Sequence, residues 1–82
     1  MRIERSMSTQ LTIPRLEMAM TDGVLAEWLV ADGAQVKEGD PIYSIETGKA
    51  VQEIQAPTSG RLVQRARAGE TYLVGTDIGE IV

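Results

Sequence analysis

The hydrophobic positions of this chain fall into short runs separated by glycine and proline. Most runs are about four to eight residues long, which favours β-strands over helices. Their β-branched residues and partial alternation predict strands at residues 11–13, 41–45 and 51–54. Residues 24–29 differ, because their apolar positions have helical spacing and include good helix formers. Periodicity alone therefore predicts a short helix at this one place.

An internal repeat in the sequence argues against a helix at residues 24–29. Gly23 is followed by glycines 10 and 16 residues later, and by isoleucines three and six residues after the last of these. Gly60 is followed by glycines 9 and 15 residues later, with isoleucines at the same two offsets. Two similar halves of about 35 residues, built from short strands and turns, predict two small sheets packed face to face. Residues 24–29 then form a strand of the first half.

Composition narrows the possible functions. With 82 residues, of which 43% are hydrophobic and 24% charged, the chain has the composition of one ordinary globular domain. Cysteine and histidine are absent, which removes disulfides, thiolate metal sites, cysteine nucleophiles and the usual general base. A self-contained hydrolase or metalloenzyme is therefore disfavoured, and no metal site is expected. A net charge of −4 argues against a nucleic-acid partner.

The ends of the chain and its apolar stretches give simple expectations. Residues 1–9 carry two arginines but no apolar block, so we expect a loose polar tail rather than a secretory signal. Residues 10–82 form the domain. The longest apolar stretch, residues 24–31, is interrupted by Glu27 and is far too short to span a bilayer. We therefore expect no membrane association.

Two further features have alternative interpretations. Arg61, Arg65 and Arg67 occupy odd positions, which a strand places on one face. They fit either a docking stripe for an acidic partner or a solvated outer face, and the solvated face is favoured.

Trp28 is the only tryptophan, and we expect it in the core or at its rim rather than stacked on a ligand.

A lysine lies between the two halves of the repeat. The strands predicted at 41–45 and 51–54 flank a tight turn at Gly48 and Lys49, which predicts a hairpin. Glycine is suited to such a turn because it adopts positive φ without steric cost. Most turn lysines are simply solvated charges. Lys49, however, lies at the junction of two repeats on a protruding turn, where a modifying enzyme has access to its amine.

From residue 10 to the end, the chain resembles the lipoyl domain of the 2-oxo acid dehydrogenase complexes. The central match is residues 45–50, IETGKA, close to the family's IETDKA around its modified lysine. Further matches follow in order and at family spacing: residues 13–16 (IPRL), 20–23 (MTDG), 28–30 (WLV), 36–40 (VKEGD), 56–60 (APTSG) and 74–78 (VGTDI). Gly48 stands where the family usually has an acidic residue, and the interval from Gly60 to Gly69 is one residue shorter than usual.

The resemblance implies an all-β fold, a flattened barrel of two four-stranded antiparallel sheets with pseudo-twofold symmetry. It also implies lipoic acid in amide linkage to Lys49, a swinging arm that carries acyl groups and electrons between active sites. The implied partners are a lipoate ligase or lipoyl transferase, a thiamine-diphosphate-dependent decarboxylase, an acyltransferase core and dihydrolipoamide dehydrogenase. The hairpin residues read by the ligase are then Glu46, Thr47, Gly48 and Ala50. The loop that contacts the decarboxylase comprises Arg15, Leu16, Glu17, Met18, Ala19 and Met20.

Two other functions share this fold. A biotin carrier also has a hairpin lysine, but methionines typically flank it, whereas Gly48 and Ala50 flank Lys49 here. An unmodified adaptor, in which Lys49 is a plain surface charge, has only Gly48 in its favour. The domain lacks the residues for catalysis of its own, although it fits the leading part of a dihydrolipoamide acyltransferase. We expect a monomeric domain in the bacterial cytoplasm, with the mitochondrial matrix as the alternative.

Overall fold

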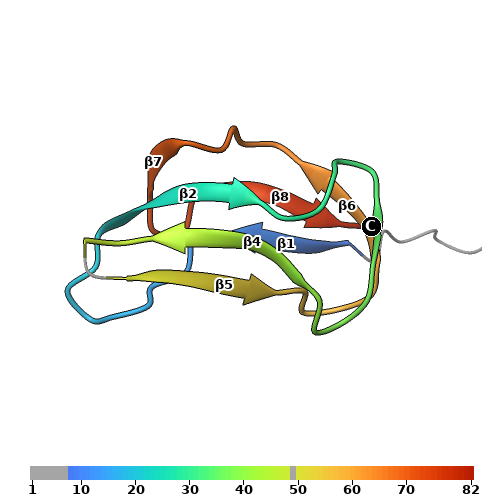
Figure 1. Ribbon diagram of the computed structural model, residues 1–82, viewed down its shortest axis with the longest axis horizontal. Helices are drawn as coiled ribbons and strands as arrows, with labels where there is room; N and C mark the ends of the chain where they lie inside the picture. Colours follow the sequence, from blue (N-terminus) through green and yellow to red (C-terminus); the bar gives the residue numbers. More distant parts are fainter. Residues whose placement is uncertain (1–7, 49) are drawn as a thin grey trace, which may run out of the picture.

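Short antiparallel strands form two sheets in the computed structural model, which describes residues 8–48 and 50–82 (Figure 1). In chain order the strands are β1 (Thr9–Thr12), β2 (Asp22–Trp28), β3 (Gln35–Val36), β4 (Pro41–Glu46), β5 (Val51–Gln55), β6 (Gly60–Gln64), β7 (Glu70–Leu73) and β8 (Asp77–Ile81). One sheet has the order β1-β8-β6-β3 and the other β5-β4-β2-β7. Most of the predicted tail, residues 1–7, lies outside the described residues, and β1 already begins at Thr9.

The sheet orders contain the predicted pseudo-twofold symmetry. Exchanging β2 with β6, β4 with β8, β7 with β3 and β5 with β1 converts one order into the other. The registers agree, because Leu25 of β2 pairs with Ile45 of β4, and Leu62 of β6 pairs with Ile81 of β8. These four side chains are at most 1% exposed. The repeat of glycines and isoleucines therefore places equivalent apolar pairs at the centre of each sheet.

Residues 24–29 are extended rather than helical, as the repeat predicted. They lie in β2 up to Trp28, in the middle of the second sheet between β4 and β7. Their helical spacing has a structural origin in a β-bulge between Leu25 and Glu27, which shifts the alternation of buried positions by one residue. Within the described ranges, no helix has the length and apolar character needed to cross a membrane.

Trp28 lies at the rim of the core, as expected. Its ring is half-buried and packs against Tyr43, with ring centroids 5.5 Å apart and planes tilted by 57°. The indole Nε1 donates a hydrogen bond to the carbonyl oxygen of Ala66 at 3.0 Å, so the polar end of the ring is satisfied. The Tyr43 hydroxyl donates to the carbonyl oxygen of Thr12 at 3.0 Å, which joins β4 of one sheet to β1 of the other.

The arginines expected on one strand face are arranged differently. Only Arg61 lies in β6, whereas Arg65 and Arg67 follow the end of that strand. Arg65 forms ion pairs with Glu80 at 2.7 Å and with Asp77 at 3.2 Å. Its guanidinium is thus held against β8, and the three arginines do not form a free basic stripe.

The two ends of the fold differ. The β4–β5 hairpin lies at one end, and the C-terminus lies at the other, where β1 also begins (Figure 1). At that far end, Arg61 and Val82 form two backbone hydrogen bonds with each other, both 2.9 Å long. The pair is equivalent by symmetry to Val24 and Glu46, which pair beside the hairpin. Under the pseudo-twofold, the hairpin turn therefore corresponds to the place where the chain enters and leaves the fold.

A substitution at Gly79 tests how Trp28 packs against the sheet β1-β8-β6-β3. A Cβ atom at this position would collide with the carbonyl oxygen of Val63 and would lie 3.4 Å from the Trp28 ring. We expect Gly79→Ala to lower the free energy of unfolding by about 1–3 kcal/mol, the usual cost of overpacking. Urea denaturation measures it. Gly48→Ala is the matched control, since a Cβ there meets nothing within 4 Å and φ is not left-handed. Equal stability of the two variants would contradict the packing described here.

Tyr43 makes stability depend on pH in the alkaline range. Burial raises the pKa of its hydroxyl from 10.0 to about 12. Because the folded pKa lies above the unfolded one, the stabilisation is complete below pH 10 and is lost as pH rises towards 12, by about 2–3 kcal/mol in all. In Tyr72→Phe, where Tyr43 is the remaining tyrosine, ultraviolet titration of the phenolate should show this late midpoint. A midpoint near 10 in the folded protein would show that Tyr43 is accessible to solvent.

Candidate functional site

The hairpin around position 49 is closed by its own backbone. β4 and β5 pair antiparallel up to Glu46 and Val51. Beyond this pair, the Thr47 N–H donates to the carbonyl oxygen of Ala50 at 2.8 Å, and the Thr47 hydroxyl contacts the same oxygen at 3.3 Å. Lys49 itself lies outside the described residues. Its neighbours on both sides, Gly48 and Ala50, are exposed, so β4 and β5 form the hairpin predicted from the sequence and the two residues that flank position 49 face solvent.

Gly48 does not use the conformation for which glycine was expected. Its φ lies outside the left-handed region, and the space where a Cβ would stand is open. Positive φ occurs instead at Gly33, Gly39, Gly69 and Gly75, in turns that match between the two halves of the repeat. The expectation of positive φ at Gly48 is therefore wrong, because the hairpin closes through the bond from Thr47 to Ala50 with Gly48 outside the left-handed region.

The loop predicted to contact a partner lies beside the hairpin and is braced internally. The Met20 N–H donates to the carbonyl oxygen of Glu17 at 3.1 Å, and the Arg15 guanidinium donates to the carbonyl oxygen of Met18 at 3.0 Å. The Leu16 N–H points to the Met20 sulfur at 3.2 Å. These bonds hold a short turn whose tip is Met18, which is 89% exposed.

The six residues of this loop have two different roles. Arg15, Glu17, Met18 and Ala19 are exposed and available to a partner. Met20 is only 6% exposed and belongs to the core, and Leu16 packs against that core from its edge. The prediction of a direct partner contact is thus wrong for Met20, since its side chain is buried. Met20 instead fixes the loop to the body of the domain.

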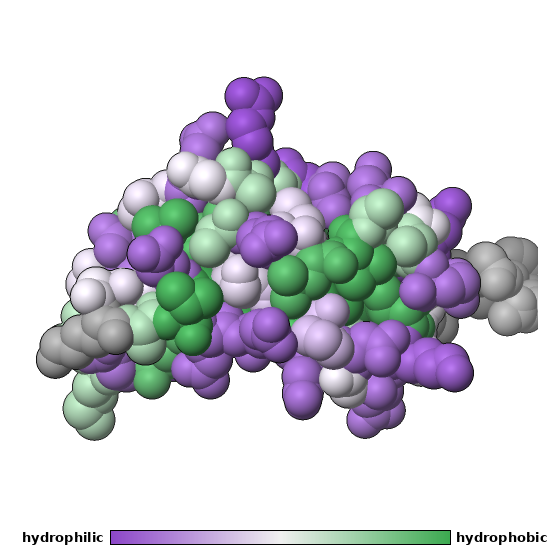
Figure 2. All heavy atoms as spheres, viewed as in Figure 1, coloured by the Kyte–Doolittle hydropathy of each residue, from purple (hydrophilic) through white to green (hydrophobic). Residues whose placement is uncertain are grey.

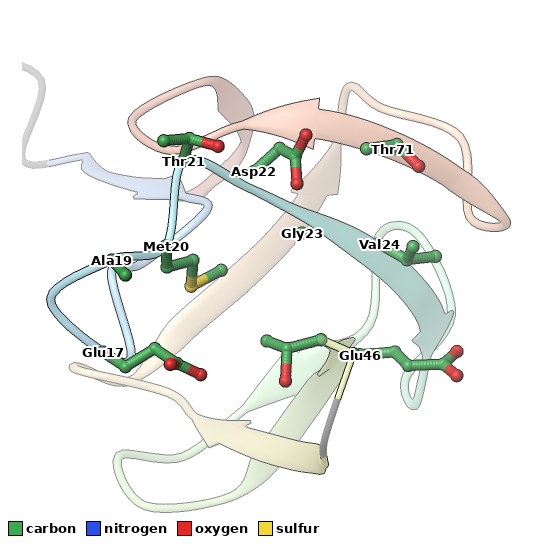
Figure 3. Close-up of a pocket in the computed structure, with 11 residues that line it drawn as sticks. Glu17, Ala19, Met20, Thr21, Asp22, Gly23, Val24, Glu46 and Thr71 are labelled. Atoms are coloured by element: carbon green, nitrogen blue, oxygen red, sulfur yellow. The ribbon is translucent and has the colours of Figure 1, made fainter.

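A groove of about 510 Å³ separates the loop from the hairpin (Figure 3). The loop forms one wall and the hairpin residues Glu46, Thr47 and Gly48 form the other. Strand β2 supplies the floor between them, and Thr71 of β7 closes the far side. The full lining is Glu17, Ala19, Met20, Thr21, Asp22, Gly23, Val24, Glu46, Thr47, Gly48 and Thr71. Three of the four residues predicted as ligase contacts and three of the six predicted as partner contacts therefore line one depression, and Ala50, Arg15, Leu16 and Met18 are not among its lining residues.

Sequence reasoning missed Asp22, Val24 and Thr71 as part of this site. Val24 pairs with Glu46 on one side and with Thr71 on the other, so Thr71, Val24 and Glu46 form one row across the outer face of the sheet. The row depends on the order β4-β2-β7, in which β7 comes from the second half of the repeat. The internal repeat indicated two similar sheets, but did not show that each sheet takes an edge strand from the other half.

Comparison with known proteins places the chain in a family. A family model for biotin and lipoyl attachment, described as "Biotin-requiring enzyme", matches residues 9–81. The chain belongs to the biotin/lipoyl attachment family. In the solved structure of the lipoyl domain of the 2-oxoglutarate dehydrogenase complex from Azotobacter vinelandii, the fold superimposes with a TM-score of 0.75. That domain is 30% identical, and the match covers 89% of this chain and 94% of the other. The resemblance and the all-β fold inferred from the sequence are thereby confirmed.

The curated relatives are acyltransferase components. The acetyltransferase component of the pyruvate dehydrogenase complex of Zymomonas mobilis is 44% identical over 84 residues, which cover 93% of this chain and 19% of that protein. The succinyltransferase component of the 2-oxoglutarate dehydrogenase complex of Rickettsia felis is 33% identical over 92% of this chain and 19% of its own length. The chain thus spans about a fifth of these relatives. It is a small attachment domain and not itself a catalytic unit.

The described part of the site fits a covalently attached arm. Open space surrounds Gly48, and Ala50 is exposed. The described neighbours of position 49 therefore leave room for an attached group. Within residues 8–48 and 50–82, no three acidic, histidine or cysteine side chains are grouped to hold a metal ion. Attachment chemistry is therefore supported by the geometry of the hairpin and its surroundings.

Gly48→Asp tests whether the hairpin tolerates the acidic residue common in this family. Because φ at Gly48 is not left-handed and a Cβ meets nothing within 4 Å, we expect the free energy of unfolding to change by less than about 0.5 kcal/mol. We also expect modification of Lys49 by a lipoate ligase to be retained or improved, as followed by intact mass. A variant that folds normally but is no longer modified would show that the ligase depends on the absence of a side chain at Gly48.

Proposed function

We propose that this domain is a lipoyl carrier, with lipoic acid in amide linkage to Lys49. The observation that carries the proposal is the exposed hairpin, closed by the bond from Thr47 to Ala50, in a domain with a lipoyl-domain fold. The group on Lys49 supplies a dithiolane that takes up an acyl group together with two electrons, and the protein supplies its presentation. Acyl groups and electrons then pass between the active sites of a 2-oxo acid dehydrogenase-type complex.

The hairpin acts as a rigid mount. Behind its tip, Ile45 is fully buried in the core and Glu46 pairs with both neighbouring strands, so the turn is anchored within two residues of Thr47. A lysine amine, with an ordinary pKa near 10.4, is almost wholly protonated at neutral pH. A ligase must therefore deprotonate it and align it with an activated acyl group, a step that depends strongly on geometry. Exposed Glu46, Gly48 and Ala50, together with Thr47, offer the surface for that alignment.

The hairpin that carries Lys49 and the C-terminus of the domain lie at opposite ends of the fold (Figure 1). The start of β1 and the C-terminus lie at the end opposite the hairpin (Figure 1). A linker at that end leaves the hairpin free while it keeps the domain near its partners, which raises their effective concentration. We assign the partners as a lipoate ligase or lipoyl transferase, a thiamine-diphosphate-dependent decarboxylase, an acyltransferase core and dihydrolipoamide dehydrogenase. Arg15, Glu17, Met18 and Ala19 form the exposed loop for the decarboxylase.

The decisive experiment is the intact mass of the protein purified from its own host, followed by peptide mapping. We expect the mass increment of one lipoyl group, located on Lys49 and lost in Lys49→Ala. The control is Lys37→Ala, which removes the only other lysine and should leave the modification in place. Because an exposed turn side chain contributes little to folding, both variants should keep the wild-type free energy of unfolding within about 0.5 kcal/mol.

Other outcomes of this experiment would overturn the proposal. A biotinyl increment on Lys49 would make the domain a biotin carrier, and an unmodified mass would make it an adaptor of the same fold. Modification that persists in Lys49→Ala would place the attachment site elsewhere.

A further inference from the structure

The groove between loop and hairpin has no part in the function proposed so far. A ligase needs the hairpin tip, and a decarboxylase needs the exposed loop, but neither requires a depression between them. The groove nevertheless begins at Glu46, Thr47 and Gly48, the three residues that directly precede Lys49. Any group on Lys49 is therefore tethered at the edge of the groove. Tethering of this kind gives an effective concentration of about millimolar or more, so even weak contacts are populated.

Met20 lies beneath the groove, on the core face of β2, where it fills the space that a side chain at position 23 would need. A Cβ atom at Gly23 would lie 2.7 Å from the Met20 methyl carbon and 3.1 Å from Ile45. Figure 3 shows the Met20 side chain extended from the loop towards β2, with Val24 further along the strand. Val24, on the outer face of β2, is the apolar side chain that the groove offers to a hydrocarbon group, and Met20 reaches the groove only with the 6% of its surface that is exposed.

The rim of the groove is acidic. Glu17 stands on the loop side, Asp22 at the start of β2 and Glu46 at the hairpin. None of the residues that line the groove is a lysine or arginine, and the only arginine of the loop, Arg15, is bound to the carbonyl oxygen of Met18. A depression lined by one sign of charge disfavours ligands of the same sign. This groove therefore favours uncharged groups over anionic ones.

We propose that the groove is a seat for the arm on Lys49 and that it favours arms with uncharged acyl groups over those with a carboxylate. The inference rests on the proposed lipoyl function and extends it to a class of cargo. An arm seated in the groove lies beside Val24 and next to Glu17 and Ala19 of the exposed loop. Figure 2 shows hydrophobic residues gathered in patches between hydrophilic ones on the face that it presents.

The experiment follows the methionine methyl groups by NMR in the domain before and after lipoylation by a ligase in vitro. Met20 lines the groove, whereas Met18 is 89% exposed at the tip of the same loop and serves as the internal control. We expect the Met20 methyl resonance to shift on lipoylation and the Met18 resonance to stay nearly unchanged. An unchanged Met20 resonance in fully lipoylated protein would overturn the proposal. Intact mass reports the loading separately, so failure of modification is not confused with failure of seating.

The charge preference is tested on arms that differ only in charge. The chain has no cysteine, so after reduction the thiols of the arm are its only thiols. Iodoacetamide caps them with neutral amides, and iodoacetate caps them with carboxylates of nearly the same size. We expect the anionic arm to occupy the groove about three- to tenfold less at low ionic strength, with the difference reduced by salt. Equal shifts of Met20 with both arms would overturn the preference for uncharged groups.

Two variants and a matched control distinguish contacts of the arm with the groove from contacts with the rest of the hairpin. Val24 and Val51 both pair with Glu46, on opposite sides of it, but only Val24 lines the groove. We expect Val24→Asp to abolish the lipoylation-dependent shift of Met20, and Val51→Asp to preserve it. Thr71→Glu, at an exposed position on the far wall, should also reduce the shift without a risk to folding. Loss of the shift in Val51→Asp alone, or its full retention in Thr71→Glu, would place the arm outside the groove.

Discussion

The structure depends on two equivalent cross-strand pairs, Leu25 with Ile45 and Leu62 with Ile81. All four side chains are buried almost completely, and each pair lies on the inner face of a different sheet. In a domain of 82 residues the core is small, so a few such side chains supply much of the buried apolar area. The pairs also fix register, because a one-residue slip would turn them to the outer face. Register in turn determines which residues reach the hairpin tip.

Ile45 links this core to the functional end. It is the last buried residue of β4, and beyond it come Glu46 and the closed turn from Thr47 to Ala50. On its other side, Ile45 approaches Gly23, where the absence of a Cβ leaves room for the Met20 side chain. One isoleucine thus supports both the hairpin and, through Met20, the neighbouring loop. The two walls of the groove are therefore held in a fixed relation by packing beneath the surface.

The sequence was informative wherever the repeat applied. The spacing of glycines and isoleucines predicted strands over the helical periodicity of residues 24–29, and it predicted two related sheets. It failed where a property depends on contacts between the halves. The burial of Met20 and the row of Thr71, Val24 and Glu46 follow from strand order and loop packing, which spacing does not encode. The same holds for Arg65, whose acidic partners Asp77 and Glu80 lie 12 and 15 residues away in the chain.

Pseudo-twofold symmetry has a consequence for how such a domain works. The symmetry maps the β4–β5 hairpin onto the pair of β8 and β1, so the two ends of the barrel are built alike, but only one is closed by a turn. The closed end presents a short loop fixed on both sides by paired strands, whereas the other end holds Val82 next to the start of β1. The two ends of the fold's strand ladder, β1 and β8, therefore lie in the sheet that does not contain β4 and β5. The hairpin geometry is thus set by strand pairing within one sheet, while the chain ends are paired within the other.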